Sequence, residues 1–336
     1  MPSPQPRKIA LGFDNYSIRA LGWKAPRLLD YAASLKLDMV LFSDLGVYER
    51  LDDAYLKDIR LKAADLGLSI HAGTGGICPS SHLYPADAEP AEDHLRRTIR
   101  VARALGSPVA RCYLGIWKDR ETEGGIAVHI RNTVRVLKAV RGEARDAGVR
   151  IAVENHAGDM QARELVALVE EAGRDFVGVT ADSGNAVWTF DHPLLSLEIL
   201  APYVVTTGLR DSMLWETADG VEMQWTAMGD GLVDWKAYFA RFAELCPGVP
   251  AVLEIIPGLR RAFPHRRDGF WKAWPQARQE EVEQLLALAP RGRPLAVGYP
   301  PGGDPMGEAG ALLQKTELER SVRYCKESLG LGMRDG

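Results

Sequence analysis

The sequence predicts an α/β fold, a (β/α)8 TIM barrel with a C-terminal helical extension. Eight short apolar runs alternate with longer amphipathic stretches over residues 8–257, which indicates eight strand–helix units in series. Runs such as Ile151-Ala152-Val153 are apolar at successive positions, as in parallel strands that helices cover on both faces. Eight such units close naturally into a barrel. The competing fold is a doubly wound open sheet, but the stretch LGFDNYS after the first run lacks the glycine-rich phosphate-binding pattern of that fold.

The predicted strands are short runs of apolar and β-branched residues, each bounded by Gly, Asp or Pro. In chain order they cover residues 8–13, 38–43, 68–73, 108–115, 150–155, 177–182, 203–210 and 250–256. Amphipathic helices are predicted between them at residues 26–37, 92–106, 124–148, 161–173 and 234–245. Three of these helical segments end in glycine, which is typical of a helix C-terminus.

The chain after the last predicted strand has a different composition. A long irregular and then helical segment leads to a linker rich in proline and glycine at residues 290–305, and an amphipathic helix follows. We therefore predict a barrel over residues 1–289, and a linker and C-terminal helix over residues 290–336 that pack on the barrel.

Composition and charge exclude several classes of protein. The net charge of −4 and the pI of about 6.0 provide no basic face for nucleic acid. The sequence has no apolar run of the length, about 18 residues, that a membrane span requires, and it does not begin with a signal peptide. Its four cysteines are scattered along the chain, which indicates reduced thiols and not a set of disulfides. We therefore expect a cytoplasmic protein with no nucleic-acid or membrane partner.

Three acidic residues stand at the predicted ends of strands five, six and eight, namely Glu154, Asp182 and Glu254. The chemistry of such a barrel lies at the C-terminal ends of its strands, so these carboxylates are expected to converge at one mouth. Close carboxylates repel one another, and a divalent cation removes that conflict. The structural alternative for any one of them is a helix cap or a salt bridge.

Further polar residues at strand ends are candidates for the same site. His156 is interpreted as a general base or a hydroxyl ligand with a pKa near neutrality, or else as a structural histidine, and the same choice applies to His71. Arg111 and Arg210 would be costly if buried unpaired, so they bind substrate oxygens or neutralise acids across the barrel. The predicted substrate-binding residues are His71, Arg111, Asn185, Arg210 and Asp211.

Four tryptophans fall in predicted strand-to-helix loops, at positions 117, 188, 215 and 225. Sugar rings stack on indole faces, although such residues also pack a lid. The loop at residues 211–231 is long for a barrel connection, and long loops in compact domains tend to be functional. We interpret it as a pocket wall that narrows the choice of substrate.

The motifs AVENHA, VTADSGNA, TTGLRDS, GDGLVDWKAYFARF and AVLEI resemble, in order and spacing, the xylose isomerase-like TIM barrels of the sugar phosphate isomerase/epimerase family. The resemblance covers residues 8–257. It implies a divalent metal held by a Glu from strand five, an Asp from strand six, a His from strand seven and a Glu from strand eight. Glu154, Asp182 and Glu254 take three of these places.

The sequence departs from the family pattern at strand seven. The family often has His-x-Lys-Asp there, whereas this chain has Gly208-Leu209-Arg210-Asp211, so Gly208 stands where the fourth ligand is expected. The amide oxygen of Gln224 could replace it, or Gln224 is a surface residue. An all-oxygen site favours Mn²⁺ or Mg²⁺, with Co²⁺ or Zn²⁺ as alternatives. Asn185 stands where some epimerases carry a substrate-binding His.

The resemblance implies a metal-dependent sugar isomerase or epimerase. A base takes the proton next to a carbonyl, an enediolate forms, and the two glutamates return and remove protons on opposite faces, with His156 as a further catalytic candidate. The alternative is a metal-dependent lyase or dehydratase acting on a keto-sugar, an oxidised glycoside or an inositol-like polyol. Family members of that kind work with a small partner subunit.

Two other classes of function follow from the same barrel. A phosphodiesterase resembling AP endonucleases needs many His ligands, and few of the seven histidines stand at strand ends. A sugar-binding scaffold that has lost its metal is compatible with Gly208. The C-terminal helix suits a homo-oligomer as well as a tail folded back on its own barrel.

Overall fold

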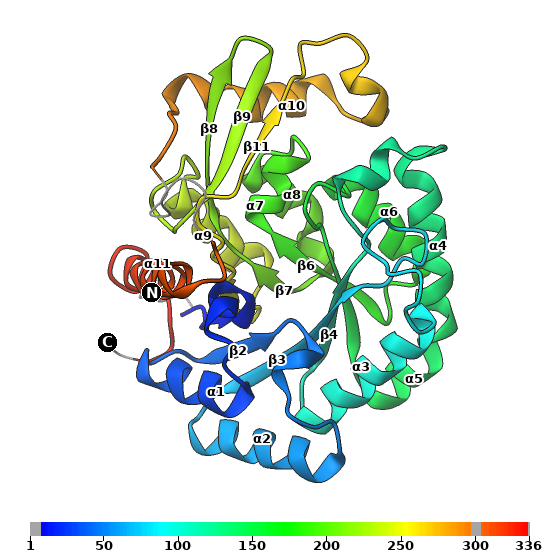
Figure 1. The fold of residues 1–336 in the computed structure, drawn as a ribbon, viewed down its shortest axis with the longest axis vertical. Helices are drawn as coiled ribbons and strands as arrows, with labels where there is room; N and C mark the ends of the chain where they lie inside the picture. Colours follow the sequence, from blue (N-terminus) through cyan, green and yellow to red (C-terminus); the bar gives the residue numbers. More distant parts are fainter. Residues whose placement is uncertain (1–7, 297–303, 335–336) are drawn as a thin grey trace, which may run out of the picture.

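Eight parallel strands form a barrel in the computed structural model, which describes residues 8–296 and 304–334 (Figure 1). Around the barrel the strand order is β10-β1-β2-β3-β4-β5-β6-β7. The strands are β1 (Leu11–Asp14), β2 (Met39–Phe42), β3 (Ser69–Gly76), β4 (Val109–Tyr113), β5 (Arg150–Glu154), β6 (Val177–Asp182), β7 (Val204–Gly208) and β10 (Ala251–Leu253). A bridge between Leu209 and Leu253 joins the last two strands, so the barrel is nearly closed. The predicted (β/α)8 barrel is confirmed.

The register of the strands brings their carboxyl ends to one rim. Tyr113 pairs with Glu154 across β4 and β5, and Asp182 pairs with Gly208 across β6 and β7. The apolar residues that precede these ends are fully buried, with no exposed surface at Val153. Because the strands are parallel, every polar residue that ends a strand faces the same opening.

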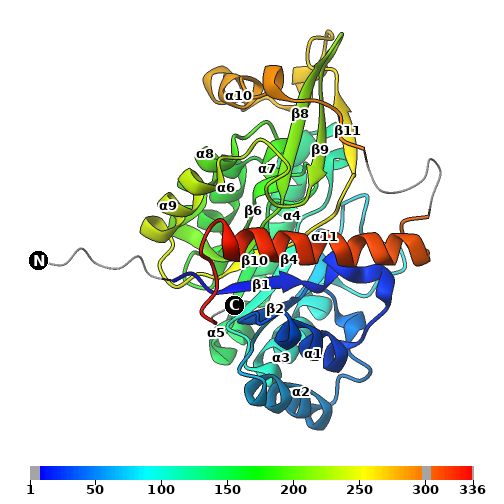
Figure 2. The same cartoon turned by 90° about the vertical axis from the view of Figure 1, so that its left-hand side faces the viewer.

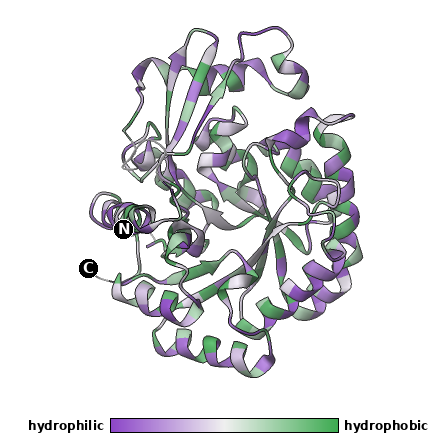
Figure 3. Ribbon diagram, in the orientation of Figure 1, coloured by the Kyte–Doolittle hydropathy of each residue, from purple (hydrophilic) through white to green (hydrophobic). Residues whose placement is uncertain are grey.

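Helices cover the outside of the barrel with their apolar faces turned inward (Figure 3). They are α1 (Ala25–Ser34), α2 (Asp53–Asp65), α3 (Ala91–Leu105), α4 (Gly125–Ala139), α5 (Arg141–Ala147), α6 (Ala162–Ala172), α8 (Pro193–Leu200) and α9 (Trp235–Leu245), whereas the short, fully buried α7 (Ser183–Trp188) follows β6 directly at its carboxyl end. The single helix predicted at 124–148 is two helices, because Val140 leaves the helical conformation. The sequence reading missed α2, whose polar composition hides the buried residues Tyr55, Leu56 and Ile59.

The segment predicted as a long loop at 211–231 is largely a β-hairpin. Strands β8 (Asp211–Thr217) and β9 (Gly220–Thr226) pair antiparallel, and β11 (Arg260–Phe263) extends them to a three-stranded sheet. This sheet stands beyond the barrel at the top of Figure 1, with α10 (Gln279–Leu286) across it. A separate apolar cluster, which includes Trp188, Trp225 and Trp274, packs beneath it.

The C-terminal helix α11 (Glu308–Glu327) crosses the outside of β10 and β1 (Figure 2). It also contacts the short 3-10 helix η1 (Asn15–Leu21). The helix therefore packs on the barrel, while the domain boundary at residue 289 stays a prediction. All four cysteines are buried and free. Within residues 8–296 and 304–334, no helix combines the length and the apolar character needed to cross a bilayer.

We expect Gln314→Ala to lower the free energy of unfolding by about 1 kcal/mol, because it removes two partly buried hydrogen bonds that join the helix to the barrel and to the chain before it. The fully buried Gln314 accepts from the backbone N–H of Ala20 at 3.0 Å and donates to the carbonyl of Pro305 at 3.0 Å. Urea denaturation measures the change. Leu312→Ala is the control, since Leu312 is on the same helix and 66% exposed. Equal losses in the two variants would contradict the proposed docking of α11.

Candidate functional site

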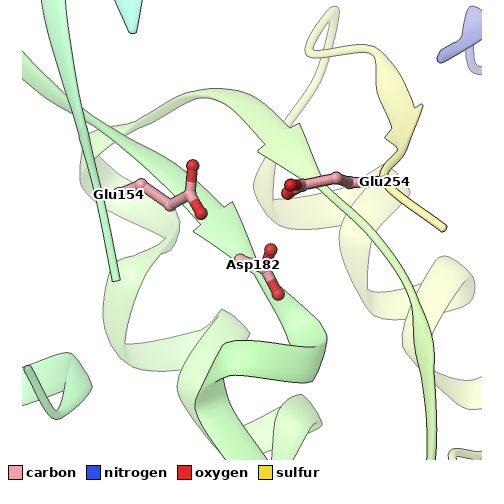
Figure 4. Close-up of side chains that lie close together, drawn as sticks. All are labelled: Glu154, Asp182 and Glu254. Atoms are coloured by element: carbon pink, nitrogen blue, oxygen red, sulfur yellow. The ribbon is translucent and has the colours of Figure 1, made fainter. Parts of the chain in front are cut away.

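Three buried carboxyl groups meet at the mouth of the barrel. Glu154 ends β5, Asp182 ends β6 and Glu254 follows β10, and Figure 4 shows their side chains pointing toward one another. Their potential ligand oxygens all lie within 4.8 Å of one another, and each residue is buried. The structure therefore brings together the three acids that the sequence singled out, close enough to hold a metal ion.

Two buried arginines neutralise these acids. Arg111 donates from Nε to Glu154 at 2.5 Å and from Nη1 to the carbonyl of Thr74 at 3.1 Å. Arg210 donates from Nη2 to Glu254 at 2.6 Å and also to Asp182. Of the two roles that the sequence left open for these arginines, the structure displays charge neutralisation.

Asp14, at the end of β1, is a fourth acid in this cluster and was not among the candidates from the sequence. Its carboxylate accepts hydrogen bonds from the Ser43 hydroxyl at 2.6 Å and from the backbone N–H of Tyr16 at 2.8 Å. Its position at the end of a buried strand was the available sign. The cluster thus contains four carboxyls and two guanidiniums.

Burial, together with the excess of acids over arginines, raises the pKa of most of the carboxyls. Burial, with a further contribution from the charge on Glu254, raises the pKa values of Asp14 and Asp182 to about 7. Burial raises the pKa of Glu154 as well. The charge on Arg111 lowers this pKa, and the charges on Glu254 and Asp182 offset part of that effect. At neutral pH the cluster therefore retains protons.

Glu254 differs from the other acids, because its pKa is lowered. Burial opposes its charge, but Arg210 and Arg111 both favour the charged form and prevail. Burial also opposes the charge on Arg210, yet the acids around it raise its pKa. Glu254 is thus the carboxylate of the cluster that carries a stable negative charge.

Asn185 connects two of the acids. Its Nδ2 donates to Glu154 at 3.0 Å, and its backbone N–H donates to Asp182 at 2.7 Å. Its Oδ1 is buried and has no hydrogen-bond partner in the described structure. This unpaired acceptor is available to a ligand hydroxyl, which supports the substrate-binding role predicted for Asn185.

A cavity of about 590 Å³ opens above the cluster. Its floor includes Glu254, Arg111, Arg210 and Asn185, whereas Glu154 and Asp182 lie behind the arginines. Its walls are mainly aromatic and apolar, with Tyr16, Tyr113, Ile116, Trp117, Trp188, Trp225, Ile256 and Leu259. Three of the four predicted tryptophans thus line the cavity, and Trp225 comes from the β8–β9 hairpin that the sequence predicted as a pocket wall.

His156 also lines the cavity, but it is not the near-neutral base that the sequence predicted. Its ring stacks on Tyr113 with centroids 3.7 Å apart, and its Nδ1 lies 2.7 Å from the carbonyl of Gly115. A carbonyl only accepts, so Nδ1 carries the proton and Nε2 is an acceptor. Burial and the charge on Arg111 lower the pKa of His156 to about 4, so the ring is neutral.

The structure does not bring His71 to the cavity. Strand β3 continues to Gly76, three residues beyond the predicted end, so His71 lies deeper in the barrel. Its Nδ1 is 2.9 Å from the Thr206 hydroxyl on β7, and burial lowers its pKa to about 4. In the described structure His71 is thus a buried residue of the barrel core, and its substrate-binding role stays a prediction without support from this geometry.

Asp211 and Gln224 have structural partners instead of the predicted ligands. The carboxylate of Asp211 accepts from the backbone N–H groups of Gly229 and Gly231 at 3.0 Å, which holds the chain between β9 and α9. The amide of Gln224 makes two hydrogen bonds of 3.2 Å with the backbone of Leu295. Gln224 belongs to a strand of the hairpin and is not part of the group of acids that could hold a metal, so this structure does not support the predicted metal-ligand role.

Gly208 faces the acids directly. A Cβ atom placed on it would lie 3.0 Å from Oδ2 of Asp182 and 3.3 Å from Oε2 of Glu254. A side chain here would point into the triad, as the family resemblance requires of a fourth ligand. In this chain, the same two oxygens accept hydrogen bonds from Arg210.

The donor set of the three acids decides whether a divalent cation fits here. Three carboxylates suit Mg²⁺ or Mn²⁺ by their chemistry. However, Oδ2 of Asp182 and Oε2 of Glu254 bind the Arg210 guanidinium, and a second cation between them would meet a like charge. With Arg210 in this position the residues do not fit a divalent metal.

A family model described as "Xylose isomerase-like TIM barrel" matches residues 29–288. The chain is 24% identical over 241 residues to a protein named 3-oxo-isoapionate decarboxylase from Pectobacterium atrosepticum, which covers 68% of this chain and 79% of that protein. Among solved structures, D-psicose 3-epimerase in the presence of D-fructose has a TM-score of 0.57 at 19% identity, covering 83% of this chain and 97% of the other.

A second solved structure, the IOLI protein described with a binding zinc atom, also has a TM-score of 0.57. Its identity is 15%, and the match covers 84% of this chain and 96% of that one. At these identities the structural matches establish a shared fold, and the fold is the one predicted from the sequence.

We expect His71→Asn to make the protein less sensitive to acid. The pKa of His71 is about 4 in the folded protein against 6.5 for a free histidine, so between these values the unfolded chain binds a proton that the folded one does not. The folded wild type therefore loses stability as the pH falls from about 6.5 to 4, by about 3 kcal/mol for this one group. Urea denaturation of both proteins at pH 7 and pH 4.5 measures the difference, and identical losses would reject the assignment.

Proposed function

This chain belongs to the xylose isomerase-like TIM barrel family, and we propose that it isomerises or epimerises a sugar or sugar derivative. The reaction proceeds by removal of a proton next to a carbonyl, through an enediolate intermediate. The observation that carries the proposal is Glu254, a carboxylate with a lowered pKa on the floor of a small cavity, beside two buried arginines. Such a group is charged at neutral pH and borders the cavity, as a general base requires.

The environments of Glu254 and Glu154 shift their pKa values in opposite directions, so the first is ionised and the second is protonated. Glu254 is ionised and takes the proton from carbon, while the raised pKa of Glu154 keeps a proton available for return. Glu154 lies behind Arg111, so this second role requires Arg111 to shift when the substrate binds. The neutral His156 presents Nε2 to the cavity and accepts a hydrogen bond from a substrate hydroxyl.

The cavity supports a substrate of monosaccharide size. Its volume of about 590 Å³ lies within the usual range for small-molecule sites, and its tryptophans provide flat apolar faces for a sugar ring. The unpaired Oδ1 of Asn185 accepts from a hydroxyl at the floor. A homo-oligomer, a small partner subunit and a cytoplasmic location stay predictions from the sequence.

The enediolate needs positive charge nearby, and Arg111 and Arg210 supply it as donors in a buried site. The alternative source is a divalent Mn²⁺ or Mg²⁺ held by Glu154, Asp182 and Glu254, which when bound would polarise the carbonyl as a Lewis acid. That alternative requires Arg210 to leave Asp182 and Glu254, with which it pairs.

The second candidate function is a lyase, favoured by the similarity to the protein named 3-oxo-isoapionate decarboxylase. Loss of CO₂ from a 3-oxo acid leaves an enolate, and the same two arginines would stabilise it. Elimination from a keto-sugar, an oxidised glycoside or an inositol-like polyol would begin with the same proton abstraction.

We expect Glu254→Gln to reduce turnover by about 10²–10⁴-fold, because it removes the general base. The assay measures deuterium incorporation from solvent into a panel of ketoses and keto-sugar acids. Glu154→Gln should lose turnover to products while retaining part of the exchange, since it removes only the proton return.

The matched control is Glu164→Gln. Glu164 is also buried and paired with an arginine, Arg120, but it lies at the start of α6 outside the cavity. A folded Glu164→Gln protein should exchange deuterium at the wild-type rate. Full activity in Glu254→Gln would reject the role given to Glu254.

The isomerase and the lyase are separated by their products. Incubation with 3-oxo sugar acids should release no CO₂ if the first candidate holds, while ketoses become labelled with deuterium. Release of CO₂ that depends on Glu254 or Arg210, without isomerisation of any ketose, would replace the first candidate with the second.

A further inference from the structure

The Arg210 guanidinium lies where the family resemblance places a cation. Its Nη2 binds both Asp182 and Glu254, on the oxygens that a side chain at Gly208 would approach. The strand-seven motif thus departs from the family pattern twice. The imidazole ligand is replaced by glycine at 208, and an arginine two residues later reaches the same oxygens.

The surrounding structure is built to hold Arg210 in this place. A Cβ atom at Gly184 would overlap the aliphatic part of Arg210, lying 2.6 Å from its Cδ, so only glycine leaves room there. The Trp225 ring lies against the guanidinium at 4.3 Å, and its Nε1 donates to the carbonyl of Gly184 at 2.9 Å. The Ser183 hydroxyl bonds both the N–H and the carbonyl of Arg210.

These contacts immobilise a side chain that is 1% exposed. Arginine is a long, flexible residue, and a buried guanidinium is stable only where acids or other acceptors are fixed around it. Asp182 and Glu254 are those acceptors. Gly184, Trp225 and Ser183 hold the side chain and its backbone in place. The arrangement is therefore a built cation site with its cation supplied by the chain.

We propose that the Arg210 guanidinium is the resident cation of the Glu154–Asp182–Glu254 triad, and that it excludes a divalent metal from these acids. A metal ion on Asp182 and Glu254 would share its ligand oxygens with the guanidinium, and the two positive charges would repel each other strongly in this buried place. The inference goes beyond the proposed function, since it concerns the cation of the site whatever the substrate is.

The proposal also assigns a contact to Arg210 that a metal could not make. Arg210 lines the cavity, and its buried Nε has no hydrogen-bond partner in the described structure. The proposal assigns this N–H as a donor to a ligand oxygen. A guanidinium acts there by hydrogen bonding, with a fixed geometry.

The test is Mn²⁺ binding to the full chain after treatment with EDTA, measured by isothermal titration and by the melting temperature. The wild type should show no stoichiometric binding at Mn²⁺ concentrations up to about 1 mM, a range in which typical specific sites are filled. The double variant Gly208→His/Arg210→Ala should bind one Mn²⁺ per chain and melt at a higher temperature when Mn²⁺ is added. Adding Asp182→Asn should abolish that binding.

The matched control is Arg120→Ala, which removes another buried arginine from its glutamate. Arg120 pairs with Glu164 outside the triad, so this variant should lose stability without gaining Mn²⁺ affinity. Arg210→Gln, which keeps hydrogen-bonding groups, replaces the double variant if that protein does not fold, and it should also gain Mn²⁺ affinity.

Stoichiometric Mn²⁺ binding by the wild type that Asp182→Asn abolishes would overturn the proposal. A folded Arg210 variant that binds no Mn²⁺ would also overturn it, because the guanidinium would then not be what excludes the metal. Neither measurement uses a substrate, so failure to find sugar turnover would count against the proposed function alone.

Discussion

The structure of the mouth depends on the balance of charge among side chains that are out of water. Four acids end or follow strands of the barrel, and a lone buried carboxylate is costly. Arg111 pairs with Glu154, and Arg210 pairs with Asp182 and Glu254. The acids still outnumber the arginines, and burial raises the pKa of carboxyls such as Asp182. Glu254, which both arginines favour, is the exception with a lowered pKa. The distribution of protons over the site follows from which acid each arginine contacts.

The barrel architecture crowds buried acids together, and the same crowding creates the candidate site. Parallel strands deliver all their carboxyl ends to one rim, so acids far apart in the sequence become neighbours. Hydrogen bonds then fix them, as when Asn185 donates to Glu154 from its side chain and to Asp182 from its backbone. The cavity floor that results exposes one charged carboxylate and two guanidiniums, a combination suited to making and stabilising an enolate.

The three-stranded sheet contributes both to the wall of the cavity and to the position of the buried positive charge. Trp225 belongs to β9, lines the cavity and has its ring centroid 4.3 Å from the central carbon of the Arg210 guanidinium. It also stacks on Trp188 with ring centroids 4.2 Å apart. A substitution in this hairpin would therefore alter both the fit of a ligand and the position of the positive charge. The wall of the cavity and the Arg210 guanidinium are therefore one packed unit.

The sequence by itself determined the barrel and the convergence of Glu154, Asp182 and Glu254, because a strand's apolar run and the polar residue that ends it are local features. Only the tertiary structure decided which of the candidates meet. His71 was placed at a strand end but lies deeper in the barrel, since β3 runs further than its composition indicates. Gln224 and Arg210 both follow β7, yet the first bonds the backbone of Leu295 and barrel packing brings the second onto the acids. Side-chain direction and charge partners depend on neighbours distant in sequence, and local patterns carry no record of them.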